Sequence, residues 1–263
     1  MSTLQPTGRG IFARHDTAFG WTLRIVSLGI VLALWQWYGR LGESFAIAPV
    51  SEVAKALWTG LTEGDFLRAT AGTLLTMAVG YVIAVVIGVS VGLFIGVSSY
   101  ARNTLEPLVH AAYATPISLL IPVIGIYTGL DFRGRVTLTV LWCVFEILVA
   151  TTTGVREAPT SLISVARSFT APRTMIYRTI ILPAALPYVA LGLRIGVARA
   201  MRGAVTAELL LSAVNLGKIL THAGSTFDIP TLLAGIIFVM LLGLVLMYLA
   251  EGIEKRATRH RAA

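Results

Sequence analysis

Charged side chains inside long apolar runs are the residues of this sequence most able to do chemistry. Glu146 interrupts the run 136–155, and a second run, 184–212, contains Arg194, Arg199, Arg202 and Glu208. An ionisable group among apolar residues is costly, so it usually pairs with an opposite charge or faces water. If the two runs are antiparallel helices, Glu146 and Arg199 lie at similar depth. We therefore predict an ion pair between Glu146 and Arg199 or a neighbouring arginine, with either a packing or a ligand-contacting role.

Arg194 and Glu208 are not expected to form such a pair. They project from similar sides of a helix, but their separation along its axis is about 21 Å. Glu146, Arg199 and Glu208 are nevertheless candidates to line a polar path, because charges in a membrane span commonly face one.

Motifs for other kinds of chemistry are largely missing. The only lysine that follows a glycine, Lys218, precedes Ile219 rather than Ser or Thr, so there is no phosphate-binding loop and the chain is not expected to hydrolyse ATP. Cys143 is the single cysteine, which excludes an intramolecular disulfide and a thiolate metal cluster. We predict no bound cofactor and no metal site. An intramembrane serine hydrolase that uses a serine with His110 is kept as an alternative.

The composition indicates where these residues act. Of 263 residues, 56% are hydrophobic and 13% are charged, whereas soluble domains average about 45–50% and about 25%. A soluble surface needs more charge than this, so the chain is predicted to be an all-α polytopic membrane protein. The net charge of +8 is spread thinly between apolar runs, so a nucleic acid partner is not expected.

Six membrane spans are predicted from runs of about 20 apolar residues. They cover residues 22–39, 69–97, 107–130, 136–153, 184–212 and 229–250, between an N-terminal tail, 1–21, and a basic C-terminal tail, 251–263. The first run could instead be a signal peptide with a cleavage site at Ala46-Ile47-Ala48. Pro49 directly after that site, and the aromatic residues before it, fit a retained helix better.

The basic residues indicate the orientation of these spans. With both termini cytoplasmic, the inner segments hold twelve Lys and Arg residues and the outer segments hold six, which are Arg40, Lys55, Arg68, Arg133, Arg135 and Lys218. The positive-inside rule therefore predicts cytoplasmic termini. The outer segment 42–67 has helical apolar spacing, which predicts a short amphipathic helix with Ser51 as its N-cap.

Small residues and prolines mark two of the spans. Gly88, Gly92 and Gly96 would line one helix face and allow close approach by another helix, which we interpret as packing. Pro116 and Pro122 each remove a backbone donor inside the span 107–130, so they kink it or free carbonyl groups toward a cavity. A pore-lining or gating segment and a purely structural kink both fit this pattern.

The longest inner loop, 154–183, contains the most structured segment outside the spans. Four apolar residues follow helical spacing between Pro159 and Pro172, namely Leu162, Val165, Ala166 and Phe169. A short helix with such a stripe, flanked by Arg167, could lie on anionic lipid or dock in a groove of a soluble partner.

The same loop resembles the signature of permease subunits of bacterial ABC importers, which reads Glu-Ala-Ala, then Gly, then Ile-x-Leu-Pro. The corresponding residues are Ser164-Val165-Ala166, Thr170 and Ile180-Ile181-Leu182-Pro183. Further segments are similar to the branch that serves nitrate, sulfonate and taurine, including Ala166-Arg167-Ser168, Leu182-Pro183-Ala184-Ala185-Leu186-Pro187, Gly192-Leu193-Arg194 and Ala207-Glu208. The resemblance covers nearly all of residues 20–255.

The resemblance implies a type I ABC importer permease fold of six spans with a cytoplasmic coupling helix, in the bacterial inner membrane. The chain would form a homodimer or pair with a related permease, and would bind two cytoplasmic ATPase subunits that hold ATP and magnesium. It would receive a small organic or oxyanion solute from an extracytoplasmic binding protein. The residues that the resemblance places at the ATPase are Leu162, Ser164, Val165, Ala166, Arg167, Phe169, Thr170 and Pro183.

Several positions depart from the family pattern. Ser164 stands where the signature has Glu, Val165 where it has Ala, and Thr170 where it has Gly. A glycine adopts a left-handed helix end without steric penalty, so Thr170 predicts a different cap or a modest strain. Glu146 also departs from the branch, in which an apolar residue or proline is common. A membrane scaffold with an uncoupled loop is therefore a second alternative.

Overall fold

The computed structural model describes residues 16–41 and 47–258, and this part of the chain is helical without strands. The helices are α1 (Asp16–Arg40), α2 (Val50–Thr62), α3 (Asp65–Val97), α4 (Ser99–Ala114), α5 (Ile121–Thr128), α6 (Phe132–Arg156), α7 (Thr160–Ser168), α8 (Arg173–Ile176), α9 (Leu182–Ala207), α10 (Asn215–Ser225) and α11 (Ile229–Thr258). A 3₁₀ turn spans Ile117–Leu120, and π-helical turns span Tyr177–Ile181 and Glu208–Ser212. Most of the predicted N-terminal tail, the end of the C-terminal tail and residues 42–46 lie outside the described residues.

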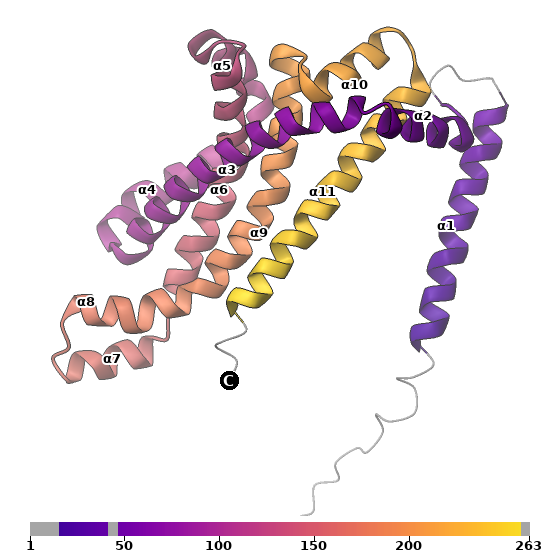
Figure 1. The fold of residues 1–263 in the computed structure, drawn as a ribbon. Helices are drawn as coiled ribbons and strands as arrows, with labels where there is room; N and C mark the ends of the chain where they lie inside the picture. The colour runs from indigo at the N-terminus through magenta and orange to yellow at the C-terminus, as the bar shows by residue number, and fades with distance from the viewer. Residues whose placement is uncertain (1–15, 42–46, 259–263) are drawn as a thin grey trace, which may run out of the picture.

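Three long helices form the core, in which α6 packs along both α3 and α9 (Figure 1). The face of α3 toward α6 is lined by Gly80, Gly88, Gly92 and Gly96. A Cβ atom on Gly92 would lie 2.7 Å from Cβ of Thr151 and 2.8 Å from the carbonyl oxygen of Leu148. On its other side, α6 meets three glycines of α9, which are Gly192, Gly196 and Gly203. The packing role predicted for the α3 glycines is confirmed, because only residues without a side chain let the backbones approach this closely.

Buried hydroxyl groups of this core are hydrogen-bonded, as a region without water requires. Thr76, Thr139 and Thr151 each donate to the carbonyl oxygen four residues earlier. Thr152 of α6 donates instead to the carbonyl oxygen of Gly92 on α3, at 3.2 Å. Cys143 is fully buried among the same helices. The core is therefore closely packed, and these hydroxyl groups have partners inside the protein.

Four helical segments are long and apolar enough to cross a membrane: Asp65–Val97, Phe132–Arg156, Arg173–Ser212 and Ile229–Lys255. The predicted span 107–130 is not one helix, since α4 ends at Ala114 and the segment Ile117–Thr128 leaves it at 88°. Proline disfavours a helical conformation in the residue before it, and Thr115, before Pro116, is extended with φ −74° and ψ 128°. The two pieces make a fifth candidate span only when they are taken together.

The predicted first span, 22–39, lies within α1, which is not one of those four segments. Arg24 and Gln36 lower its mean hydropathy. The total of six spans therefore stays a prediction.

A polar joint connects α1 to α2. Gln36 accepts a hydrogen bond of 3.0 Å from the backbone N–H of Ser51 and donates one of 3.2 Å to its hydroxyl. Trp35 donates from Nε1 to the carbonyl oxygen of Ala48, at 3.0 Å. The predicted short helix is present, but the prediction of Ser51 as its N-cap is wrong: the helix begins at Val50 after Pro49, because Gln36 of α1 satisfies the Ser51 donor.

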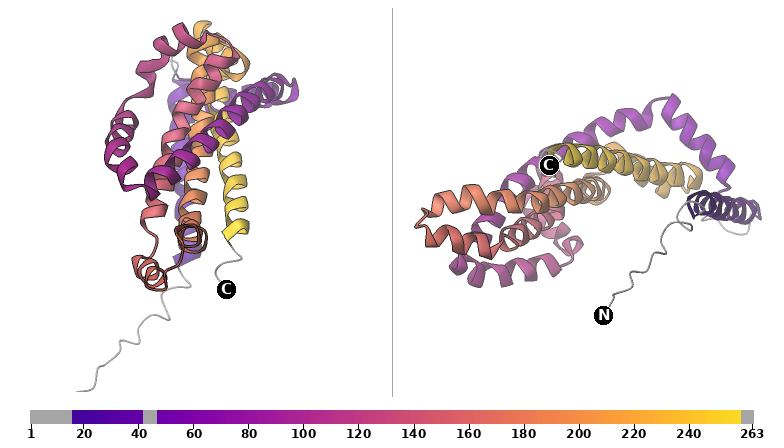
Figure 2. Two further views of the ribbon diagram at one scale, coloured as in Figure 1. Left: turned by 90° about the vertical axis from the view of Figure 1, so that its left-hand side faces the viewer. Right: turned by 90° about the horizontal axis from the view of Figure 1, so that it is seen from below.

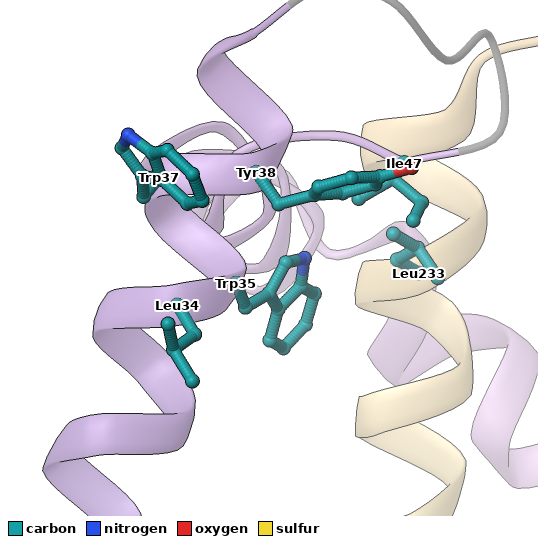
Figure 3. Close-up of a pocket in the computed structure, with 6 residues that line it drawn as sticks. All are labelled: Leu34, Trp35, Trp37, Tyr38, Ile47 and Leu233. Atoms are coloured by element: carbon teal, nitrogen blue, oxygen red, sulfur yellow. The ribbon is translucent and has the colours of Figure 1, made fainter.

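The two ends of the bundle differ in what they present. α7 and α8 project from the end at which α1 begins and α11 ends, whereas α2, α5 and α10 lie at the opposite end (Figure 1). Seen from below, α1 stands apart from the core (Figure 2). The open hollow between α1 and α11 has a volume of about 570 Å³ and is lined by Leu34, Trp35, Trp37, Tyr38, Ile47 and Leu233 (Figure 3). This lining is almost wholly apolar and brings no charged group into the hollow.

Candidate functional site

The ion pair predicted between the two apolar runs is confirmed. Nη2 of Arg199 on α9 lies 2.6 Å from Oε1 of Glu146 on α6. The same oxygen accepts a hydrogen bond of 3.0 Å from the hydroxyl of Tyr113 on α4. The side chains of Arg199 and Glu146 are 37% and 15% exposed, so the pair lies at the edge of the core. Three helices thus meet at one group of polar residues, which we call the Glu146 cluster: Tyr113, Glu146 and Arg199.

The other arginines of α9 have different environments. Nη1 of Arg194 lies 3.3 Å from Oε2 of Glu254 on α11, so Arg194 pairs with Glu254 and not with Glu208, as the axial separation predicted. Arg202 is exposed, and in the described part of the chain no carboxylate lies within ion-pair distance of it. Within the described residues, two of the three arginines are therefore neutralised and the third is not.

Glu208 is fully buried and is bonded to three other groups of the chain. Its carboxylate accepts hydrogen bonds from the Thr73 hydroxyl at 2.8 Å, the Asn215 side-chain amide at 2.7 Å and the Gly217 backbone N–H at 3.4 Å. A Cβ atom on Gly217 would lie 2.6 Å from Cβ of Glu208, so the contact depends on glycine. Glu208 thus ties the end of α9 to α3 and α10, and its predicted place on a polar path stays a prediction.

Helix α4 is held to α6 mainly by polar side chains. Among its own residues α4 buries only Ala101. Besides Tyr113, the link is Glu106, whose Oε1 lies 2.8 Å from Nη1 of Arg156 at the end of α6. A hollow of about 110 Å³ lies between α4 and α6. Two polar contacts therefore link α4 to α6, and the packing between these contacts is incomplete.

His110, the residue on which the hydrolase alternative depends, lies beside this hollow. Its Nε2 is 3.7 Å from Oε1 of Glu106. The lining of the hollow contains Thr152 and Thr153 but no serine, and no serine hydroxyl bonds to His110 within residues 16–41 and 47–258. The hydrolase alternative therefore receives no support.

The two prolines proposed for a path or a kink behave differently. Pro116 stands at the break between α4 and α5 and accounts for the bend. Pro122 lies in the first turn of α5, where the missing N–H has no intrahelical partner in any case. Both are exposed at the surface of the chain. Pro116 thus makes the predicted kink, whereas a path-lining role for either proline stays a prediction.

The short helix predicted in the inner loop is present as α7, and its apolar face is uncovered. Leu162, Val165 and Phe169 are 53%, 54% and 80% exposed, and Ala166 is half-buried. Arg167 flanks this face and is also exposed. We call the exposed residues Leu162, Val165 and Phe169 the α7 apolar face.

Two residues of the family signature sit apart from this face. The Ser164 hydroxyl donates to the carbonyl oxygen of Thr160 at 2.9 Å, so it is bonded within α7 and does not take the place of a carboxylate. Pro183 lies in the first turn of α9, beyond α8 and the π turn Tyr177–Ile181. It is therefore placed to shape the entry into α9 rather than to belong to α7.

Thr170 adopts the left-handed conformation that the signature glycine would favour, with φ 55°. Its N–H donates to the carbonyl oxygen of Arg167 at 2.9 Å, and the N–H of Ala171 donates to that of Ala166 at 3.0 Å. These two bonds form a Schellman motif. Strain, rather than a different cap, is therefore the outcome, at a cost of about 1–2 kcal/mol for a residue with a Cβ atom.

Sequence reasoning missed Tyr113, Thr73 and Asn215, which complete the two carboxylate environments. All three contact residues that lie on other helices or beyond a π turn, so periodicity gives no signal for them. A weak signal exists for Asn215, because asparagine tolerates the left-handed conformation and its φ is 51°.

The end opposite α7 carries a polar hollow with a volume of about 790 Å³. It lies among α2, α3, α10 and the start of α11, and its charged lining residues include Glu52, Lys55, Asp65, Lys218 and Asp228. With Glu63, four carboxylates line this hollow against two lysines, so its charge balance is acidic.

Comparison with known proteins reveals similarity along most of the chain. The model of the family described as "Binding-protein-dependent transport system inner membrane component" matches residues 84–259. The riboflavin transport system permease protein RibX of Chloroflexus aurantiacus is 32% identical over 90% of this chain and 90% of its own length. The taurine transport system permease protein TauC of Escherichia coli is 27% identical over 90% of this chain and 89% of its own. A chain of the MetNI methionine ABC transporter, solved in inward-facing conformations, has a TM-score of 0.61 at 22% identity, over 74% of this chain and 94% of that one, and so has the same fold.

Proposed function

This chain belongs to the family of binding-protein-dependent transport system inner membrane components and is the permease subunit of an ABC importer with the type I fold, and on that premise we propose how it works. Two cytoplasmic ATPase subunits bind and hydrolyse ATP with magnesium, and the permease itself holds no cofactor. Two permease copies, or this chain and a related permease, enclose the solute path. An extracytoplasmic binding protein delivers the solute to the end that carries α2 and α10.

The α7 apolar face carries this proposal. Three large apolar side chains at one end of the bundle would be left in water in the isolated chain, and each gains about 1.5–3 kcal/mol when it is fully buried. A groove on the ATPase supplies that burial, and so α7 is the coupling helix. The left-handed stop at Thr170 then turns the chain back toward α8 and α9.

The orientation follows from the same end of the molecule. The start of α1 and the end of α11 lie on the side of α7 (Figure 1). The excess of Lys and Arg in the segments on that side fits the cytoplasm by the positive-inside rule. Both termini and the coupling helix are therefore cytoplasmic.

Movement of α7 reaches the membrane through α4. Arg156 ends α6 just before the coupling loop and holds Glu106 of α4. Tyr113, farther along α4, donates a hydrogen bond to Glu146, which forms an ion pair with Arg199 of α9. Docking that shifts α6 against α4 therefore changes the Glu146 cluster, and the importer alternates between inward and outward states by such differential contacts. Glu146 and Arg199 line the path, with the bend at Pro116 beside them.

The solute is a small organic or oxyanion molecule. Among the similar proteins are permeases for riboflavin and for taurine. The resemblance to the nitrate, sulfonate and taurine branch favours an anionic or zwitterionic solute.

The coupling assignment is tested by Phe169→Asp, which places a charge on the α7 apolar face. Co-expression of the importer subunits and co-purification of the ATPase with the permease measures docking, and uptake into proteoliposomes measures transport. We expect loss of ATPase co-purification and at least a tenfold loss of uptake. Phe227→Asp is the matched control for ATPase co-purification, because Phe227 is 78% exposed near the opposite end. Unchanged uptake by Phe169→Asp would contradict the assignment of α7 as the coupling helix and favour an uncoupled scaffold.

A further inference from the structure

One face of α9 is left uncovered by the rest of the chain. α6, α3 and α11 pack against its other sides (Figure 1). The positions on this side recur every three or four residues and form one stripe, which we call the α9 stripe: Leu191, Ile195, Ala198, Arg202, Thr206 and Leu210. Ala198 and Thr206 are half-buried, and Leu210 lies in the π turn that follows α9. Leu191, Ile195 and Leu210 are 43%, 39% and 60% exposed. Arg202 is the charged member of this otherwise neutral stripe.

Arg202 lies near the middle of the membrane-spanning region. The next residue, Gly203, packs on α6, where a Cβ atom would lie 2.8 Å from Cβ of Trp142. Helix α6 runs from Phe132 to Arg156, so Trp142 is about 15 Å from one end and about 21 Å from the other along the axis. The hydrocarbon core of a bilayer is about 30 Å thick, so Arg202 is too deep for its guanidinium to reach either surface easily.

The charge of Arg202 is not balanced within the described residues. Glu254 neutralises Arg194, and Glu146 neutralises Arg199, which lies one helical turn before Arg202. Turned toward lipid at this depth, an unpaired arginine costs about 2.5–3.5 kcal/mol or more. A stripe that carries such a residue is therefore expected to face water or another polar group rather than acyl chains.

We propose that the α9 stripe forms part of the solute path and that Arg202 is its anion-binding residue. The solute that it takes carries a sulfonate or carboxylate group, because a guanidinium fork matches two oxygens of such a group. Thr206, four residues further on the same face, brings a hydroxyl that can donate a third hydrogen bond. Arg199 does not serve in this way, because Glu146 already holds it.

This inference rests on the proposed function and adds a residue and a ligand class to it. Arg202, which has no acidic partner among residues 16–41 and 47–258, attracts the anion, while the Glu146 cluster beside it adds no net charge. The side chains of Leu191, Ile195 and Leu210 leave the rest of the stripe weakly binding, so that an anion held at Arg202 can also leave.

The location of Arg202 is tested by placing a cysteine at this position and measuring how fast it reacts with a water-soluble thiol reagent. Arg202→Cys is made in the full importer in proteoliposomes and treated with the anionic reagent 2-sulfonatoethyl methanethiosulfonate, in the absence and presence of ATP. Cys143 is fully buried, so the parent protein gives the background. The matched control is Val86→Cys on the outer side of α3, where Val86 is 62% exposed.

We expect Arg202→Cys to react at least tenfold faster than Val86→Cys in one of the two nucleotide states. Equal, slow reaction of both variants would overturn the proposal, because the stripe would then face lipid. A disulfide between two copies of Arg202→Cys, without labelling, would also overturn it by assigning the stripe to a dry contact between permease copies.

The ligand class is tested by uptake of methanesulfonate and, as an uncharged probe, riboflavin, with the importer's own binding protein present. We expect Arg202→Gln to lower methanesulfonate uptake at least tenfold and Arg202→Lys to keep at least a third of it, with ATPase co-purification unchanged. The proposal would be overturned if Arg202→Gln took up methanesulfonate at the parental rate. It would also be overturned if the parent took up riboflavin but not methanesulfonate. Failure of the parent to bind the ATPase would instead contradict the proposed function, which separates the two results.

Discussion

Helix α6 makes two opposite kinds of contact. It packs closely against α3 and α9 in the core, whereas polar side chains link it to α4. The core uses glycines, so that backbones and small side chains touch along the whole length of α6. Helix α4 uses Tyr113 and Glu106, which reach Glu146 and Arg156 across a hollow. The glycine contacts of α6 with α3 and α9 have no alternative arrangement at similar energy, because close-packed surfaces cannot slide past each other in small steps. The link to α4 consists of a few polar contacts that can be exchanged for water or other partners.

This difference separates a scaffold from an element able to move. A transporter needs parts that keep their positions while others change, and elements that move are drawn from the less stable parts of a structure. The structure places the glycine contacts where α6 must stay fixed, and the polar contacts where the bent segment joins it.

The largest expected effect is a bulky side chain at the glycine contact. Gly92→Leu has no room beside Thr151 and Leu148, so it should lower the free energy of unfolding by about 3 kcal/mol or more. Thermal unfolding in detergent, followed by a thiol-reactive dye that reports exposure of Cys143, measures the loss. Gly29→Leu on α1 is the control, since nothing lies within 4 Å of a Cβ atom there. Equal stability of the two variants would contradict the fixed role of the α3–α6 contact.

The next effect is expected at the Glu146 cluster. Glu146→Gln keeps the shape but removes the charge that balances Arg199, so it should lower the free energy of unfolding by about 2 kcal/mol. The same dye assay measures it, with Glu52→Gln on the exposed face of α2 as control. If the two variants unfold alike, the ion pair contributes nothing to the attachment of α9 and α4.

A smaller effect is expected from Tyr113→Phe, which removes one hydrogen bond to Glu146 and leaves the ion pair intact. The loss should be about 1 kcal/mol and confined to α4. Amide hydrogen exchange should therefore quicken in α4 and stay unchanged in α6. Tyr100→Phe on the same helix, where Tyr100 is 83% exposed, should change neither. Faster exchange in α6 as well would mean that α4 and the core open together.

The smallest effect is expected from Glu106→Gln. The ion pair that this substitution removes is partly exposed, with Arg156 and Glu106 at 51% and 23%, so it contributes about 0.5 kcal/mol. The increase in α4 hydrogen exchange should disappear at high salt, which screens exposed charges. Glu251→Gln, which breaks the exposed pair with Lys255 on α11, is the control and should leave α4 unchanged. An effect that persists at high salt would contradict an exposed electrostatic link.

Local patterns in the sequence predicted much of this arrangement. The spacing of Gly88, Gly92 and Gly96 predicted a packing face, and the apolar spacing from Leu162 to Phe169 predicted α7. The Glu146–Arg199 pair was predictable because lipid leaves a buried charge few alternatives. In each case one strong physical constraint acts on residues that are close in the chain or equal in depth.

Other features depend on contacts that no periodicity encodes. A proline signalled a kink in the span 107–130, but not that α4 and α5 would meet at 88°. Nothing local connects Tyr113 to Glu146, or Thr73 to Glu208, because these partners belong to different helices. The uncovered position of Arg202 is also a property of how α3, α6 and α11 surround α9, and the sequence alone placed it only within a span.

The two π turns that bound α9 set the rotational register of everything between them. Each residue of an α-helix turns the chain by about 100°, and a π turn accommodates one residue more than an α turn. If either π turn, Tyr177–Ile181 or Glu208–Ser212, became an ordinary α turn, its extra residue would join the neighbouring helix. The side chains before the turn would then be rotated by about 100° relative to those after it. Such a change would also turn Gly192, Gly196 and Gly203 away from α6, so the close packing on α6 keeps α9 in the register that leaves Arg202 exposed. The extra residue in each π turn thus helps to set the side of α9 on which its charge lies.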